Sequence, residues 1–170
     1  HGSKAQRLLE RLLKDNFDVT LDLLPPLSEA QDLADDTDVQ QRWRQFVGRV
    51  FDAYAGRVSH FEIGNTPNRG KWSGFSSRGF VVASVIAHEV AANTPQKLSL
   101  VGPNVSDFEP LYNATYLRML GRLNATPAIH SDNLFVERVV EPEAYDHRVL
   151  GWAFRKPLKL NLVKKARILQ

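Results

Sequence analysis

Residues 58–92 read VSHFEIGNTPNRGKWSGFSSRGFVVASVIAHEVAA and contain one complete structural unit. The pattern predicts a strand at 58–64 that ends at a glycine, followed by a helix at 76–92. Polar residues fill the loop between them. A strand, a polar loop and a covering helix form the repeating unit of parallel α/β folds.

The preceding residues contain a helix, a strand and a second helix. Residues 4–14, KAQRLLERLLK, place four leucines on one side and charges opposite, which predicts an amphipathic helix. Residues 18–24, DVTLDLL, form a short apolar run closed by two prolines, which suits a buried strand. Apolar side chains at helical intervals predict a helix at 38–55, which stops at Gly56.

The residues after 92 repeat the alternation twice. A strand at 98–102 leads to a helix at 109–123, and a strand at 128–136 leads to a basic helix at 157–169. The chain is therefore predicted to contain one helix followed by four strand–helix units.

Alternating units of this kind predict a parallel sheet, for which two architectures remain. A doubly wound sheet commonly binds its ligand through a glycine-rich first turn, but the chain has no G-x-G-x-x-G or Walker sequence. A (β/α)8 barrel carries polar residues at the carboxyl ends of its strands, as GNTPN and VGPNVSD do here. The predicted fold is α/β, with four parallel strand–helix units that make half of a TIM-type barrel, because a whole barrel needs roughly 250 residues.

Composition limits the classes of protein that remain. The 170 residues are 43% apolar and 24% charged, which predicts a single domain over 4–170, with residues 1–3 as a tag or cloning scar. The chain has no cysteine, and its net charge of +3 is too mild to predict a nucleic-acid partner. No apolar run reaches the ~18 residues that span a bilayer, so no membrane partner is predicted and the compartment stays open.

The nonapeptide HFEIGNTPN at 60–68, with the later strand that carries Ser-Asp-Asn, resembles the central part of the clan A glycoside hydrolases. The likeness is to xylosidase-like and heparanase-like members. It implies a chain that runs from the helix after strand two of the barrel to the helix after strand six. Thr66 stands where the family has its acid/base glutamate, and the strand that carries the nucleophile would lie beyond Gln170.

The resemblance leaves the catalytic residues unknown. A threonine hydroxyl does not titrate near neutral pH and cannot replace the missing acid. Asp107 and Glu137, on the loops after the third and fourth strands of this chain, are candidate acids, with a solvated loop carboxylate as the alternative for each. Glu62 is interpreted as a buried, hydrogen-bonded residue.

Three residues are predicted to bind carbohydrate. Asn65 matches the family asparagine that hydrogen-bonds the sugar, and Asn68 lies in the same loop. Trp72 could stack on a sugar ring, with Arg69 and Lys71 beside it as donors. The alternative for Trp72 is an indole folded back over the loop.

No metal and no cofactor are predicted. The histidines are widely separated, and His88-Glu89 lacks the second histidine of H-E-x-x-H.

Two functions therefore compete. The chain is either the middle of a glycosidase that is active only in a longer parent protein, or a non-catalytic module that binds glycan or only folds. Thr66 and the absent strand favour the second.

A half barrel would also expose an apolar concave face, which predicts a homodimer. The residues assigned to this face are Val19, Leu21, Ile63, Leu100 and Ile129. The alternative is a monomeric doubly wound domain whose helices cover both faces.

Overall fold

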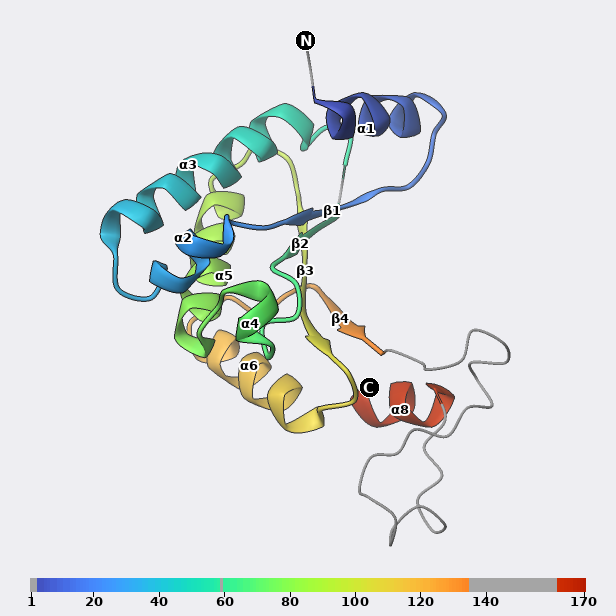
Figure 1. Ribbon diagram of the computed structural model, residues 1–170. Helices are drawn as coiled ribbons and strands as arrows, with labels where there is room; N and C mark the ends of the chain where they lie inside the picture. Colours follow the sequence, from blue (N-terminus) through green and yellow to red (C-terminus); the bar gives the residue numbers. More distant parts are fainter. Residues whose placement is uncertain (1–2, 59, 135–161) are drawn as a thin grey trace, which may run out of the picture.

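The computed structural model describes residues 3–58, 60–134 and 162–170. Its centre is a parallel sheet of four strands in the order β1-β2-β3-β4 (Figure 1). The strands are β1 Thr20–Leu23, β2 His60–Ile63, β3 Ser99–Ser106 and β4 Ile129–Asn133. Spatial order follows chain order, as in a barrel, whereas a doubly wound sheet reverses direction at a switch point. The predicted α/β class with four parallel strands is confirmed, and its topology is that of half a TIM-type barrel.

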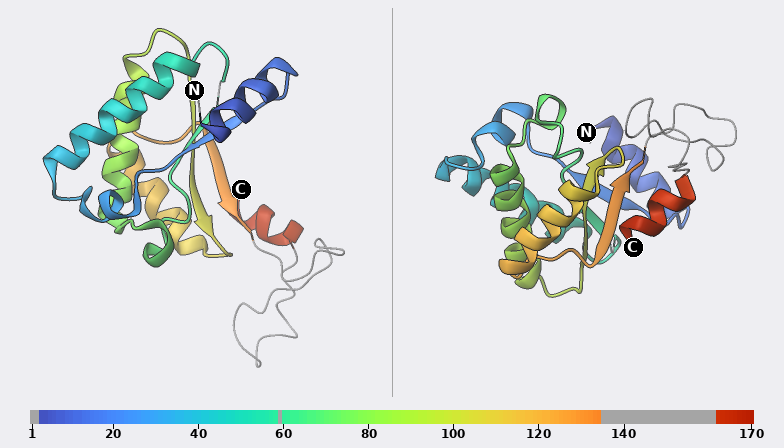
Figure 2. Two further views of the ribbon diagram at one scale, coloured as in Figure 1. Left: turned by 45° about the horizontal axis from the view of Figure 1, so that its top comes forward. Right: turned by 90° about the horizontal axis from the view of Figure 1, so that it is seen from below.

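Three long helices connect the strands and lie on one face of the sheet (Figure 2). They are α3 Thr37–Tyr54, α5 Ser77–Ala92 and α6 Pro110–Arg122, and α5 packs between the other two. Asp36 caps α3 by accepting the amides of Asp38 and Val39 at 2.8 and 3.2 Å. Ser76 caps α5 by accepting the amide of Gly79 at 3.0 Å.

Four further helices complete the described part of the chain. They are α1 Lys4–Lys14, α2 Leu27–Asp32, α4 Gly70–Ser73 and α8 Leu162–Leu169. The sequence did not predict α2 and α4, because both are too short to show a helical period. Among the described residues, no helix is long and apolar enough to cross a membrane.

The hydrophobic core lies between the sheet and the three long helices. Phe61 of β2 meets Phe51 of α3 edge to face, with ring centroids 4.8 Å apart. Trp43 is also buried, and its indole Nε1 donates to the Ala83 carbonyl at 3.0 Å. Both strands and helices thus contribute large side chains to one core.

The structure corrects the predicted apolar concave face. Ile63 and Leu100 belong to the core under the helices, and Leu21 packs against it. Only Ile129 of the five is exposed, at 41%. Side chains alternate along a strand, so on β1 and β2 the face that the helices cover takes the apolar side chains and leaves Asp22 and Glu62 on the other face. The homodimer stays a prediction, but it has lost the apolar surface on which it was based.

Candidate functional site

The carboxyl ends of β2 and β3 are shaped by left-handed backbone conformations. Thr66, Asn104 and Asp107 have φ values of 48°, 50° and 64°, and Gly64 has 73°. This conformation is costly for a β-branched threonine and persists only where the surroundings impose it. The Thr66 amide donates to the Asn104 carbonyl at 3.1 Å and so joins the two turns.

Asn68 fastens the loop after β2 to the end of β3. Its Nδ2 donates to the Ser106 carbonyl at 2.9 Å, and its Oδ1 accepts the Ser106 amide at 2.9 Å. The carboxamide therefore pairs with backbone as a strand neighbour would. Asn68, which the sequence assigned to carbohydrate binding, has both of its polar atoms engaged in holding the loop.

Arg69 ties the same loop to the beginning of α6. Its Nη2 lies 2.8 Å from Asp107 Oδ2 and 2.6 Å from Glu109 Oε1. The hydrogen bond to Asp107 is the largest of the effects that raise the pKa of Arg69. Asp107, one of the two candidate catalytic acids, is therefore engaged in an ion pair that holds the loop.

Asn65, Thr66 and Trp72 line one pocket of about 320 Å³. Leu24, Pro25, Leu27 and Ser73 complete its lining. The Trp72 side chain is 74% exposed, so the indole is not folded back over the loop. The Lys71 ammonium lies 5.6 Å from the centroid of the indole ring. The structure thus brings together two of the three residues predicted to bind carbohydrate.

A pair of carboxyl groups stands next to this pocket on the open face of the sheet. Asp22 of β1 is in register with Glu62 of β2, so their side chains point to the same face. Asn65 Nδ2 lies 3.4 Å from Asp22 Oδ2, and Asn104 Nδ2 donates to Glu62 Oε2 at 2.9 Å. The sequence had suggested the hydrogen-bonded state of Glu62 but missed Asp22 and Asn104, because their approach depends on strand register.

The environment of Asp22 favours its protonated form. Its pKa is raised from 3.8 to about 6, first by partial loss of water and then by the adjacent Glu62 charge. The hydrogen bond from Asn65 opposes this shift. Part of Asp22 still contacts solvent, so the group can exchange its proton with water or with a ligand.

One acceptor at this site has no partner. Asn65 Oδ1 is buried and accepts no hydrogen bond from any described residue. A buried polar atom of this kind costs stability unless water or a ligand satisfies it.

A second polar cluster lies between β4 and α6 and not at the open face. His130 Nε2 lies 2.8 Å from Asn113 Oδ1, and Asn113 Nδ2 lies 3.3 Å from Asp132 Oδ1. Burial lowers the pKa of His130 and raises that of Asp132 to about 6. Asn113 is only 3% exposed, so we interpret this cluster as a structural network.

The remaining predicted residues do not add to the site. Glu137 lies outside the described residues. His88 lies in α5, with its ring nitrogens 2.9 and 3.2 Å from the carbonyls of Ser84 and Thr126. No group of three or more metal-ligating side chains is present within 3–58, 60–134 and 162–170.

Comparison of the chain with protein-family models finds no match, and neither does comparison with curated proteins. The resemblance to clan A glycoside hydrolases rests on the residues quoted above.

Proposed function

We propose that the groove at the carboxyl ends of β1 and β2 binds carbohydrate. The observation that carries the proposal is that the Asn65 carboxamide and the exposed Trp72 indole line one pocket. An exposed indole stacks on the C–H face of a sugar ring, and amide and carboxyl groups bind its hydroxyls. Asp22, which is exposed beside Asn65, supplies an acceptor for those hydroxyls.

Binding without hydrolysis is the function that Thr66 favours. Its side chain cannot protonate a leaving group, and Asp107 is paired with Arg69. The geometry around Thr66 can still orient Asn65, because the strained turn fixes the backbone on either side.

Calorimetric titration with xylohexaose, cellohexaose and a heparan sulfate hexasaccharide would test the proposal. We expect at least one of them to bind, and Asn65→Ala to weaken that binding by ~1–3 kcal/mol through loss of hydrogen bonds. Gln41→Ala, which removes an exposed carboxamide from α3, is the matched control and should leave affinity unchanged. Equal affinities in wild type and Asn65→Ala would remove Asn65 from the site.

Trp72→Ala should also weaken binding, and Leu111→Ala is its control. Leu111 is 82% exposed on α6, so its removal deletes exposed apolar surface away from the groove. If both variants behave alike, the loss reflects general surface changes and the stacking role of Trp72 is wrong.

The Asp22–Glu62 pair supports a second candidate, retaining glycoside hydrolysis. In-register neighbours of parallel strands lie about 4.8 Å apart. Asp22 and Glu62 therefore start from adjacent backbone positions on the same face, and a retaining enzyme needs ~5–5.5 Å between its two carboxyls. Asp22, with its raised pKa, would protonate the leaving oxygen, and Glu62 would attack the anomeric carbon.

A panel of aryl glycosides at pH 5 to 7 separates the two functions. Hydrolysis by the pair predicts turnover that Asp22→Asn lowers by at least about 100-fold and that Asp107→Asn preserves. Turnover that Asp107→Asn abolishes would assign the chemistry to another site. No turnover would leave carbohydrate binding as the remaining proposal.

A further inference from the structure

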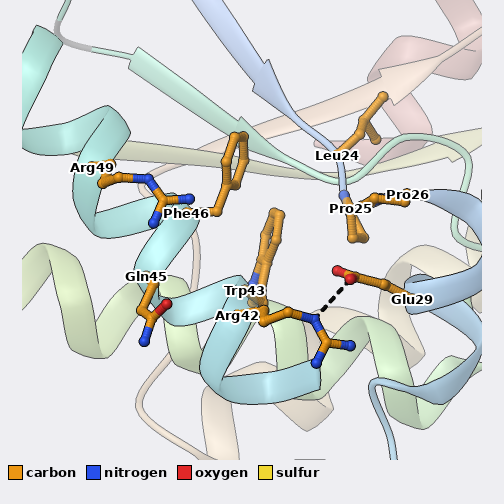
Figure 3. Close-up of a pocket in the computed structure, with 9 residues that line it drawn as sticks. All are labelled: Leu24, Pro25, Pro26, Glu29, Arg42, Trp43, Gln45, Phe46 and Arg49. Carbon is orange, nitrogen blue, oxygen red and sulfur yellow. Dashed lines mark hydrogen bonds and ion pairs between the residues drawn. The ribbon is translucent and has the colours of Figure 1, made fainter. Parts of the chain in front are cut away.

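A second pocket, of about 660 Å³, lies between the end of β1 and one side of α3 (Figure 3). Its apolar lining includes Leu24, Pro25, Trp43 and Phe46. The Trp43 and Phe46 rings stack with centroids 5.6 Å apart and planes at 29°. The indole N–H of Trp43 is already bonded to Ala83, so these two rings offer only carbon surface to a ligand.

Of the two arginines that line this pocket, Arg42 has an ion-pair partner among the described residues and Arg49 does not. Arg42 Nε donates to Glu29 Oε1 at 2.8 Å, which largely neutralises this arginine. Within the described part of the chain, Arg49 forms no hydrogen bond or ion pair with any residue. Gln45 precedes Arg49 by one turn of α3 and also belongs to the lining of this pocket. A carbon-lined cavity therefore has an unpaired guanidinium and a carboxamide at its border.

The charge of Arg49 distinguishes between the ligands or protein segments that could occupy this pocket. The apolar face of α1 from a second copy is one candidate, because α1 contains no buried residue and Leu8 is 58% exposed. The polar face of α1 carries four basic residues and only one acid, which would place positive charge beside Arg49. An anion complements Arg49, and a basic helix does not.

We propose that this pocket binds a carboxylate with an apolar body, such as a medium-chain fatty acid. The chain would lie against Leu24, Trp43 and Phe46, and the carboxylate would pair with Arg49. A mostly apolar cavity with a few convergent polar groups is the usual form of a small-ligand site, and 660 Å³ falls within its usual size range. The guanidinium can bind both carboxylate oxygens at once.

Calorimetry with decanoate and decanol, both below their aggregation limits, tests the proposal. The wild-type chain should bind decanoate at least about tenfold more tightly than decanol, because only decanoate pairs with Arg49. Arg49→Gln should abolish that preference while decanol binding stays the same. Arg118→Gln, which removes an exposed arginine from α6, is the control and should keep the preference. Equal affinities for decanoate and decanol in the wild type would overturn the proposal.

A second variant tests the cavity itself. Leu24 is 47% exposed, so Leu24→Trp should fold, as its circular dichroism and melting would verify, and should block both ligands. Unchanged decanoate binding in this variant would overturn the site. Binding to phosphatidylglycerol vesicles but not to free decanoate would assign Arg49 to a membrane surface and also overturn it. So would a wild-type dimer in light scattering that Leu24→Trp converts to monomer, because a second copy would then fill the pocket.

Discussion

The two faces of the sheet are made by the same strands and have opposite characters. Phe61 and Ile63 of β2 are buried under the helices, at 0% and 3% exposed. Glu62, between them, points to the open face beside Asp22. The helix-covered face provides the hydrophobic stability, and on β1 and β2 the open face carries the titratable pair Asp22 and Glu62.

This difference has a physical cause in the alternation of side chains along a strand. When one residue of a strand points into the core, the residues before and after it must point to the opposite face. The polar residues of β1 and β2 therefore lie on the open face. Packing of the core therefore fixes the positions of the open-face side chains, even though the core makes no contacts on that face. We expect substitutions on the helix-covered face to change stability most, and substitutions at the groove to change pH dependence and binding.

The largest expected effect is that of Phe61→Ala. Phe61 is completely buried and packs on Phe51, so its removal should lower the free energy of unfolding by ~3–5 kcal/mol. Thr20→Ala on the exposed part of β1 is the comparison and should change it by less than about 0.5 kcal/mol. Urea unfolding followed by circular dichroism measures both. Similar losses in the two variants would contradict the assignment of the faces.

Arg69→Met should have the next largest effect. It leaves Asp107 and Glu109 without their shared cation at the end of the sheet, and we expect a loss of ~1–2 kcal/mol. Arg78→Met breaks a more exposed ion pair, with Asp35, and should cost less than about 0.5 kcal/mol. A loss for Arg78→Met as large as that for Arg69→Met would show that the Arg69 bridge has no special role in holding the loop.

The open face should also affect how stability depends on pH. The folded state binds the Asp22 proton more tightly than the unfolded chain does, because the pKa is about 6 against an ordinary 3.8. The stabilisation from this proton is thus complete below about pH 4 and is lost as pH rises through 6. With solvent screening of this partly exposed group, the change is on the order of 1 kcal/mol.

Urea unfolding of wild type and Asp22→Asn at pH 4, 5, 6 and 7 would measure this effect. The difference between the two proteins isolates Asp22, because Asp132 has a pKa shift in the same direction and contributes to both. The variant should gain stability relative to wild type as pH rises. A difference that does not change with pH would contradict the raised pKa of Asp22 in the folded state.

Thr66→Asn should have the smallest effect and the opposite sign. Asparagine tolerates the left-handed conformation better than threonine, so we expect a gain of ~0.5–1 kcal/mol. Thr115→Asn, at an exposed position inside α6, has no such strain to relieve and should give no gain. Thermal melting of both variants compares them, and a loss of stability in Thr66→Asn would mean that the threonine side chain itself stabilises the turn.

The sequence predicted the order of the strands and long helices because their apolar periods are strong. It could not predict which face of each strand the helices would cover, and so it assigned Leu21, Ile63 and Leu100 to the wrong face. From the sequence of a single strand, either set of alternating residues could face the helices. The helices decide between them, and their contacts involve residues far apart in the chain.

The candidate site was predictable only in part. Asn65 and Trp72 were found from the strand-end nonapeptide and its loop, and they line one pocket. Asp22 was missed because it lies 40 residues before Glu62 and meets it only through the β1–β2 register. Asn68 looked like a free binding group because sequence alone cannot show that Ser106 engages its side chain.

Nuclear magnetic resonance of the Trp72 and Trp43 indoles tests most directly the claim that ligand binds at the open face. Trp72 is exposed beside Asn65, whereas Trp43 is buried under the sheet at 2% exposed. Titration with the hexasaccharide that binds most tightly should shift the Trp72 indole N–H and the Asn65 and Thr66 amides, and leave the Trp43 indole unchanged. Shifts of Trp43 with none at Trp72, or no shifts with any of the three glycans, would contradict the account.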